Sequence, residues 1–218
     1  MREIKLGFQA GLAAYNKGDF STALGYWLPL AEAGHADSQA WVASMHYNAE
    51  GVPLDYPAAA VWYLKAAEGG NIFAQNNLAT MYAAGQGLEK NYAEAVKWFM
   101  EAAEKSDQFA IFNLASLYDK GDGVDKNPIK AADYYRSAAE IGHVPSQSRL
   151  GYMYANGTGV ARNRVEAFMW LSLAAQHGIG SALVALEAVV EAMSAEEKLE
   201  GQRLLEARRR PSRVLRGP

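Results

Sequence analysis

The feature that most constrains the fold of this chain is a spacing of 36 residues at which the same residue types recur. From Ala110 to Gly142, an apolar helical pattern leads into a glycine loop, and a second apolar pattern ends at Ala138-Ala139. Shifting by 36 residues in either direction finds the same types, at Ala74, Leu78, Tyr82, Gly85, Gly87, Asn91, Ala95 and Trp98, and at Ser146, Leu150, Tyr154, Gly157, Gly159, Asn163, Ala167 and Trp170. A period of this length is typical of stacked structural repeats. The sequence therefore predicts an array in which each unit contacts its neighbours.

Each repeat predicts a pair of helices. Ala74, Leu78 and Tyr82 share one apolar face of a first helix, and the glycine loop from Gly85 ends that helix. Four residues of a type that caps helix N-termini precede the second helices, again 36 apart: Asp55, Asn91, Asn127 and Asn163. Glu94 and Glu166 stand three residues after two of these caps, which predicts reciprocal capping boxes.

Apolar residues near the end of each second helix predict how the units pack. Paired alanines such as Ala66-Ala67 are small enough to let helices approach closely. Large aromatic residues four positions earlier should fill the space between units: Trp62, Trp98, Tyr134 and Trp170.

The two ends of the array differ from its middle. Near the N-terminus, a shorter turn at Gly18-Asp19-Phe20 joins two helices, and Pro29 falls inside the second of them. Near the C-terminus, Ser194 and Glu197 predict a capping box before a last helix. We expect one domain over residues 1–207 with units at about 3–35, 36–70, 71–106, 107–142 and 143–178, capping helices at 181–207, and a basic, disordered tail at 208–218.

The repeated pattern resembles the Sel-1-like repeat, a branch of the tetratricopeptide-type helical repeats. The resemblance rests on Leu78, Tyr82, Gly85, Gly87, Asn91, Ala95, Trp98 and Ala102-Ala103 with their counterparts, and it extends over roughly Phe8 to Leu205. It implies an all-α, right-handed α-α superhelix (solenoid) of about five helical hairpins with a C-terminal capping helix. It also implies that the first helices line a concave face, and that the chain is a scaffold or adaptor for other proteins in a bacterium.

Composition excludes several kinds of chemistry. The chain has 218 residues and no cysteine, which removes disulfides, thiolate catalysis and cysteine-ligated metals. A formal net charge of −3 gives no reason to expect a nucleic acid partner. No apolar run is long enough for a transmembrane segment, and residues 1–8 contain no signal-peptide core. As the sequence stands we expect a cytoplasmic protein, or a periplasmic or exported one if a signal peptide has been removed.

Candidate catalytic and metal sites are weak. The loop from Asp119 to Asn127 lacks the acidic spacing of an EF-hand, with Lys130 where the closing glutamate should be. His35, His143 and His177 should lie at the C-terminal ends of second helices, where a cation or a donor is favourable, and His46 should fill a tyrosine position. We therefore expect no catalytic residue, no cofactor and no metal.

The candidate binding residues are those that the tetratricopeptide-like geometry would place on the concave face. They are Tyr47, Phe73, Asn76, Thr80, Phe109, Phe112, Ser116 and Tyr152, with the polar positions Asp37, Ser44, Asn48, Asp119, Lys120, Ser148 and Asn156 beside them. Phe73 and Phe109 stand 36 residues apart, so they could form an exposed aromatic pair that anchors a bound segment. The alternative is that both rings are packed between units.

The sequence thus predicts a non-enzymatic scaffold that binds a protein or peptide on its concave face. Two alternatives stay open: a hydrolase built on the repeats, and a structural subunit of a larger envelope or signalling assembly that uses the convex face or the basic tail. The tail itself is either solvated or bound to an acidic partner.

Overall fold

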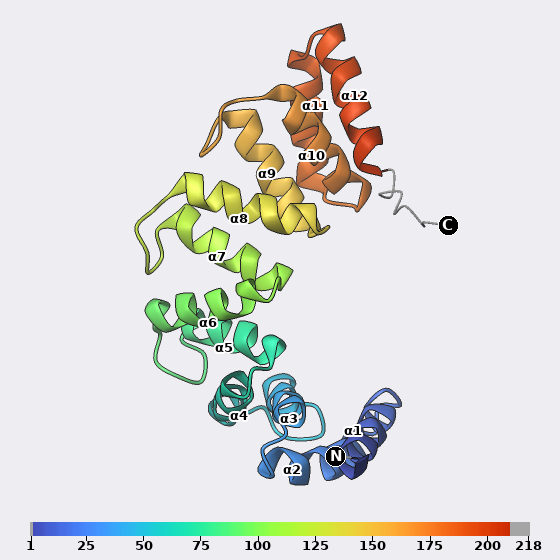
Figure 1. The fold of residues 1–218 in the computed structure, drawn as a ribbon, viewed down its shortest axis with the longest axis vertical. Coiled ribbons are helices and arrows are strands. Elements are labelled where there is room, and N and C mark those ends of the chain that lie inside the picture. Colours follow the sequence, from blue (N-terminus) through green and yellow to red (C-terminus); the bar gives the residue numbers. More distant parts are fainter. Residues whose placement is uncertain (1, 210–218) are drawn as a thin grey trace, which may run out of the picture. The chain divides into compact units, whose positions relative to one another are not determined.

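The computed structural model describes residues 2–209, which form α-helices and no strand (Figure 1). The helices are α1 Arg2–Tyr15, α2 Phe20–Glu32, α3 Ala36–Asn48, α4 Tyr56–Glu68, α5 Ile72–Ala84, α6 Tyr92–Glu104, α7 Gln108–Lys120, α8 Pro128–Glu140, α9 Val144–Asn156, α10 Arg164–Gln176, α11 Gly180–Ala192 and α12 Ala195–Arg209. The odd-numbered members from α1 to α9 are the predicted first helices, and the even-numbered members from α2 to α10 are the second helices.

The chain divides into two compact units, Met1–Ala110 and Ile111–Pro218. In unit 1, each helix from α1 to α5 packs against the next helix along the chain. In unit 2, α8, α9 and α10 each pack against the next helix, and α12 packs against α10. Contacts between sequence neighbours are the property that defines a solenoid, so the prediction of an all-α repeat array is confirmed. The single domain over residues 1–207 stays a prediction.

Aromatic and alanine positions build the core of each hairpin. The predicted aromatic residues do pack there: Trp62 lies against the cluster around Trp27, and Tyr134 lies against the cluster around Met153. The residue after each of the four predicted aromatics is buried at every repeat, with 0–2% of its surface exposed: Tyr63, Phe99, Tyr135 and Leu171. The first alanine of each pair is buried, and so are the second alanines Ala67 and Ala139, whereas Ala103 and Ala175 are half-buried.

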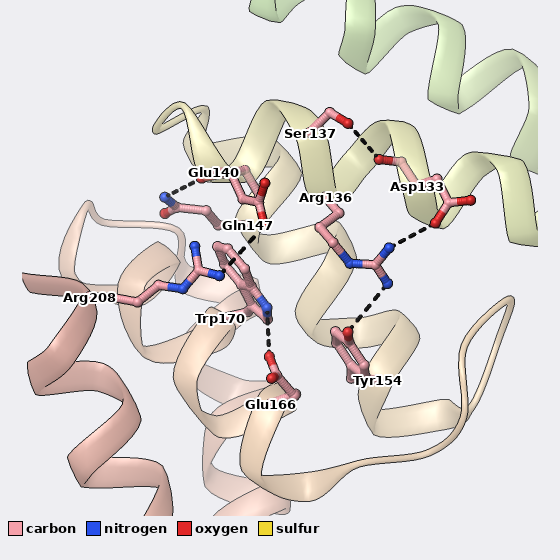
Figure 2. Close-up of polar contacts among 10 residues, drawn as sticks. Asp133, Arg136, Ser137, Glu140, Gln147, Tyr154, Glu166, Trp170 and Arg208 are labelled. Carbon is pink, nitrogen blue, oxygen red and sulfur yellow. Dashed lines mark hydrogen bonds and ion pairs between the residues drawn. The ribbon is translucent and has the colours of Figure 1, made fainter.

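The predicted N-caps of the second helices are confirmed, but the reciprocal capping boxes are wrong. The Asn91 side chain accepts from the Glu94 backbone at 3.1 Å, and Asn163 does the same for Glu166. The backbone N–H groups of these two caps donate to the carbonyls of Tyr82 and Tyr154 at 2.9 and 3.0 Å. That N–H is therefore already occupied, so Glu94 turns to Lys97 (3.4 Å) and Glu166 accepts from the Trp170 indole (3.1 Å; Figure 2).

The two loop glycines have different roles. Gly85 and Gly157 are left-handed C-caps of α5 and α9, with φ of 69° and 73°, as the sequence predicts. The second glycine lies against the first residue of the preceding second helix. A Cβ added at Gly87 would overlap the Tyr56 backbone, and one added at Gly159 would overlap the Pro128 carbonyl. Only glycine allows this close approach, which sets the distance between neighbouring hairpins.

Both ends of the array have the predicted local features, with one correction. Pro29 lies inside α2, and Ser194 and Glu197 bond each other's backbone N–H at 3.1 and 2.7 Å. Helix α12 continues through Arg208 and Arg209, so the predicted start of the tail at 208 is wrong by two residues. The Arg208 guanidinium lies 4.3 Å from the centre of the Trp170 ring and 3.7 Å from Glu140 (Figure 2). The remainder of the predicted tail lies outside the described residues.

No helix within residues 2–209 combines the length and the apolar character that a membrane span requires.

Candidate protein-binding surface

The aromatic pair predicted from the 36-residue spacing is exposed. Phe73 and Phe109 are the second residues of α5 and α7, and each has 53% of its surface exposed. The reading in which both rings are packed between units is therefore wrong. Phe73 touches the chain through an edge contact with Tyr63, with ring centres 6.1 Å apart.

Phe73 borders a cavity of about 220 Å³ in unit 1. Three elements contribute to it: α1, the first two turns of α3, and the start of α5. The lining residues are Phe8, Asp37, Ala40, Trp41, Asn71 and Phe73. The cavity is therefore formed by first helices of three successive hairpins.

The rings of the cavity are held by packing behind them. Trp41 stacks on the fully buried Trp27, with centres 4.9 Å apart, and meets Tyr15 edge-on at 4.8 Å. Phe8 contacts Trp27 at 6.2 Å and His35 at 5.3 Å. These aromatic contacts fix the lining before any partner arrives.

One carboxylate borders the same cavity. Asp37 Oδ1 accepts a hydrogen bond from Asn71 Nδ2 at 2.8 Å. Asn71 is itself oriented, because its Oδ1 caps α5 by accepting from the Ala74 backbone at 2.8 Å. Among residues 2–209, Asp37 makes no ion pair with a lysine, arginine or histidine. The site therefore combines an exposed, oriented carboxylate with aromatic walls.

The remaining candidate residues of unit 1 divide by exposure. Tyr47 is half-buried beside Tyr56 and donates to Gln86 Oε1 at 3.0 Å. Thr80 is exposed, and its hydroxyl donates to the Asn76 carbonyl at 2.9 Å. The polar position Ser44 is buried, so its predicted place on the surface is wrong.

In unit 2 the candidate residues serve packing within the chain. Phe112 is half-buried, with ring contacts to Tyr135 at 5.6 Å and His143 at 5.0 Å. The Ser116 side chain bonds Tyr135, and the Tyr152 hydroxyl donates to the Ser181 carbonyl at 2.7 Å, joining α9 to the start of α11. Ser148 is buried, which also corrects the prediction. A binding role for Phe112, Ser116 and Tyr152 stays a prediction.

Unit 2 has a second cavity, of about 290 Å³, between α9 and α11. Its lining includes the apolar side chains of Ala185 and Val189 and the basic residues Arg162 and Arg164. Arg164 forms an ion pair with Glu197 at 3.4 Å. This arginine is therefore already engaged with α12.

Two histidines act at the opposite helix end from the predicted one. His35 is the N-cap of α3: its Nδ1 accepts from the Ser38 backbone at 3.3 Å and lies 2.8 Å from the Ser38 hydroxyl. His143 Nδ1 lies 2.8 Å from the Ser146 hydroxyl at the start of α9. Two residues, the second of them a glycine, separate the end of the second helix from each histidine. The histidine side chain therefore belongs to the helix that follows. An accepting Nδ1 requires the tautomer with the proton on Nε2.

The other two histidines lie closer to their predicted places. His177 is the C-cap of α10, as expected. His46 is half-buried at the tyrosine position, and its Nδ1 is enclosed without a hydrogen-bond partner.

Sequence reasoning missed a buried glutamine that joins successive hairpins. Gln39, Gln75 and Gln147 donate through Nε2 to the carbonyls of Ala31, Ala67 and Ala139 at 3.0, 3.2 and 3.3 Å. The glutamines recur at the 36-residue spacing, except that Ile111 occupies the third of the four equivalent positions. This spacing is the sequence signal that could have revealed them. Each one holds a first helix against the end of the second helix before it.

The family model of the Sel1 repeat matches residues 36–71, 72–107, 108–143 and 144–179, which together exceed half of the chain. The chain belongs to the Sel1 repeat family. The four matches begin at the first residue of α3, α5, α7 and α9, so each Sel1 repeat is one helical hairpin and its connection to the next.

Solved structures of other Sel1 repeat proteins are similar to this chain. The c5321 protective antigen of uropathogenic Escherichia coli strains, which displays the same fold, is 33% identical with a TM-score of 0.84. That match covers 94% of this chain but 45% of the antigen, so this chain spans less than half of that protein's length. A Sel1 repeat protein from Oxalobacter formigenes is 28% identical over 94% of this chain and 86% of its own, with a TM-score of 0.79. No curated protein matches the sequence.

Among residues 2–209 no group of three or more histidine, aspartate or glutamate side chains is arranged to hold a metal ion.

Proposed function

We propose that this Sel1 repeat protein is a non-enzymatic scaffold that binds a partner protein or peptide on the first-helix surface of unit 1. The observation that carries the proposal is the exposed Phe73 ring at the border of a preformed aromatic cavity. The family supports it, since the Sel1 repeat fold is typically a non-catalytic scaffold for interactions between proteins.

The physical basis of binding would be preorganisation. Aromatic residues are enriched among the side chains that dominate binding energy at protein interfaces. Trp41 and Phe8 are fixed by the rings behind them, so little conformational entropy is lost when a partner covers them. Phe109, at the same helix position as Phe73, would extend the contact along the partner.

The hydrolase alternative has one feature in its favour and a stronger one against it. His35 with Ser38, and His143 with Ser146, are histidine–serine pairs at 2.8 Å, the distance that nucleophilic catalysis needs. Both serines are fully buried at the start of a helix. A substrate cannot reach a hydroxyl in that position. The His35 side chain instead caps α3, and His143 Nδ1 lies beside the Ser146 hydroxyl at the start of α9.

A quantitative affinity capture tests the proposal. Wild-type protein and the variants Phe73→Ala, Phe109→Ala and the double variant are immobilised, and captured proteins are compared by mass spectrometry. We expect the double variant to lose the partners that wild type captures, while its helical content and melting temperature stay unchanged.

Tyr26→Ala is the matched control, since Tyr26 is an exposed aromatic residue on the second helix α2. The proposal is wrong if the double variant retains all wild-type partners. Loss of partners in the Tyr26 variant would instead support an assembly that uses the second-helix surface.

A further inference from the structure

We infer that the cavity of unit 1 between α1, α3 and α5 is a subsite for one cationic side chain, a lysine or arginine of the partner. This inference rests on the proposed function and names the chemistry that the binding surface recognises. It is carried by the combination of aromatic walls and a single carboxylate in one cavity.

The lining has the two components that hold a cation on a long apolar stem. Phe8, Trp41 and Phe73 offer aromatic surface, which attracts a cation through the ring faces and also packs against the methylene stem of lysine or arginine. Asp37 supplies a full negative charge. Its Oδ1 accepts a hydrogen bond from Asn71, so the carboxylate is held in one orientation in the lining and can accept a charge-assisted hydrogen bond.

Size limits the occupant. The cavity measures about 220 Å³, below the roughly 300–1,000 Å³ of pockets for small molecules and cofactors. One long side chain is therefore the appropriate occupant, and the rest of the partner would lie on the exposed surface around Phe73.

Charge selects among the possible side chains. Residues 1–110 contain twelve acidic and seven basic residues, a formal charge of −5, although the whole chain carries −3. Unit 1 therefore attracts positively charged partners and repels negative ones. An anionic side chain would also meet Asp37 directly, and an apolar one would desolvate that carboxylate without a compensating partner.

The helix ends beside the cavity oppose a cation, but more weakly than Asp37 favours it. Asn71 is the N-cap of α5, and Asp37 lies in the first turn of α3. A helix N-terminus carries about half a positive charge, and its effect falls off within the first turn. The full charge of Asp37 outweighs this effect where the carboxylate itself is the contact.

The test uses three defined probes and NMR. N-acetyl-lysine N-methylamide, its arginine counterpart and the uncharged norleucine counterpart are titrated into the full-length protein, and the Trp41 indole N–H signal is followed. We expect saturable shifts with the lysine or arginine probe at millimolar affinity, and at least about tenfold weaker binding of norleucine. Asp37→Asn should weaken the cationic probe about tenfold and leave norleucine unchanged.

Tyr26→Ala is the matched control. Tyr26 is an exposed aromatic residue of α2 and lies outside the cavity, so its loss should not change probe binding, whereas Phe73→Ala should weaken binding about fivefold. Equal melting temperatures of the variants show that the fold is retained.

The outcomes separate this inference from the proposed function. Equal binding of lysine and norleucine, or no shift with any probe at about 10 mM, overturns the cationic subsite, whatever the affinity capture shows. Asp37-dependent lysine binding together with unchanged partners in the Phe73/Phe109 double variant supports the subsite and contradicts the proposed function.

Discussion

Ala49 and Ser106 are the non-glycine residues within 2–209 that have a left-handed backbone conformation, with φ of 58° and 63°. Ala49 takes the place of the glycine C-caps Gly85 and Gly157, and Ser106 takes the place of Gly70 and Gly142. A side chain with a Cβ in this conformation costs roughly 1–2 kcal/mol. The glycines at the equivalent positions have no Cβ and avoid this cost.

We predict that Ala49→Gly raises the free energy of unfolding by about 0.5–1 kcal/mol, because relief of the Cβ strain exceeds the added entropy of the unfolded chain. The melting temperature should rise by about 2–4 °C per kcal/mol for a chain of this size. The melting temperature is measured by circular dichroism during thermal unfolding.

Ala33→Gly provides the comparison, since Ala33 is also a helix C-cap but has φ of −77°. It should give no gain in stability. A destabilised Ala49→Gly variant would contradict the assigned strain.

Gly18 and Gly87 have almost the same φ, 76° and 75°, but different surroundings. No atom lies within 4 Å of a Cβ added at Gly18, whereas one added at Gly87 overlaps the Tyr56 backbone. We predict that Gly18→Ala costs about 1 kcal/mol of strain, and that Gly87→Ala costs about 1–3 kcal/mol more because the neighbouring hairpin must move.

Chemical denaturation of the two alanine variants measures this difference directly. Equal destabilisation would mean that the loop glycine is required only for its φ, and that close approach does not set the spacing of the hairpins.

At the scale of elements, the buried glutamines differ in how well they are satisfied. Gln75 donates to the Ala67 carbonyl, and its Oε1 accepts from Lys105 at 3.2 Å. Gln147 makes the same carbonyl contact at 3.3 Å, but its Oε1 is buried without a partner. A buried unsatisfied oxygen costs about 1–3 kcal/mol, so the two glutamines should contribute unequally to joining their hairpins.

We predict that Gln147→Leu destabilises the protein by about 1 kcal/mol less than Gln75→Leu. The Ala67 and Ala139 carbonyls keep their bonds from Gly70 and Gly142 in either variant. Ile111 shows that a buried apolar side chain is tolerated at the equivalent position. Denaturant unfolding of both variants is the measurement, and a greater loss with Gln147→Leu would refute the argument.

Element boundaries could be predicted from sequence because caps and loop glycines act locally. Asn91 and Asn163 cap their helices as the spacing indicates. The capping boxes failed because their N–H groups are bonded to Tyr82 and Tyr154, nine residues earlier. That bond depends on the path of the loop between the two helices, and the type of the N-cap residue does not determine this path. For the same reason, residue type alone could not show that the side chains of His35 and His143 meet serines of the following helix.

At the scale of the whole molecule, the repeat spacing predicted the array but not its candidate site. Exposure of Phe73 was one of two open readings, and the cavity beside it includes Phe8 from α1, which lies outside the four matched repeats. Sequence register relates residues at equivalent positions. It gives no direct information on a cavity formed by non-equivalent residues of three hairpins, so the carboxylate of Asp37 could not be connected with Trp41.

Buried tyrosines should make the stability of the molecule depend on alkaline pH. Burial raises the pKa of Tyr135 to about 12 from an ordinary value of 10.0, and burial with the 2.7 Å hydrogen bond to Glu50 raises the pKa of Tyr15 to about 12. Burial also raises the pKa of Tyr63. Because the folded pKa lies above the unfolded one, the stabilisation is complete below about pH 10. It is lost as pH rises toward 12, since the unfolded chain releases these protons first.

We predict that the free energy of unfolding is nearly constant from pH 8 to 9.5 and falls steeply from pH 10 to 12. At neutral pH, Tyr135→Phe should be slightly less stable than wild type, because it loses the hydrogen bond to Ser116. Between pH 10 and 12, its free energy of unfolding should fall less steeply than that of wild type, because one titrating group is gone. Denaturant unfolding at stepped pH gives both slopes. If the two proteins lose stability in parallel between pH 10 and 12, Tyr135 does not keep its proton in the folded state. Its burial would then not be a cause of the alkaline loss of stability.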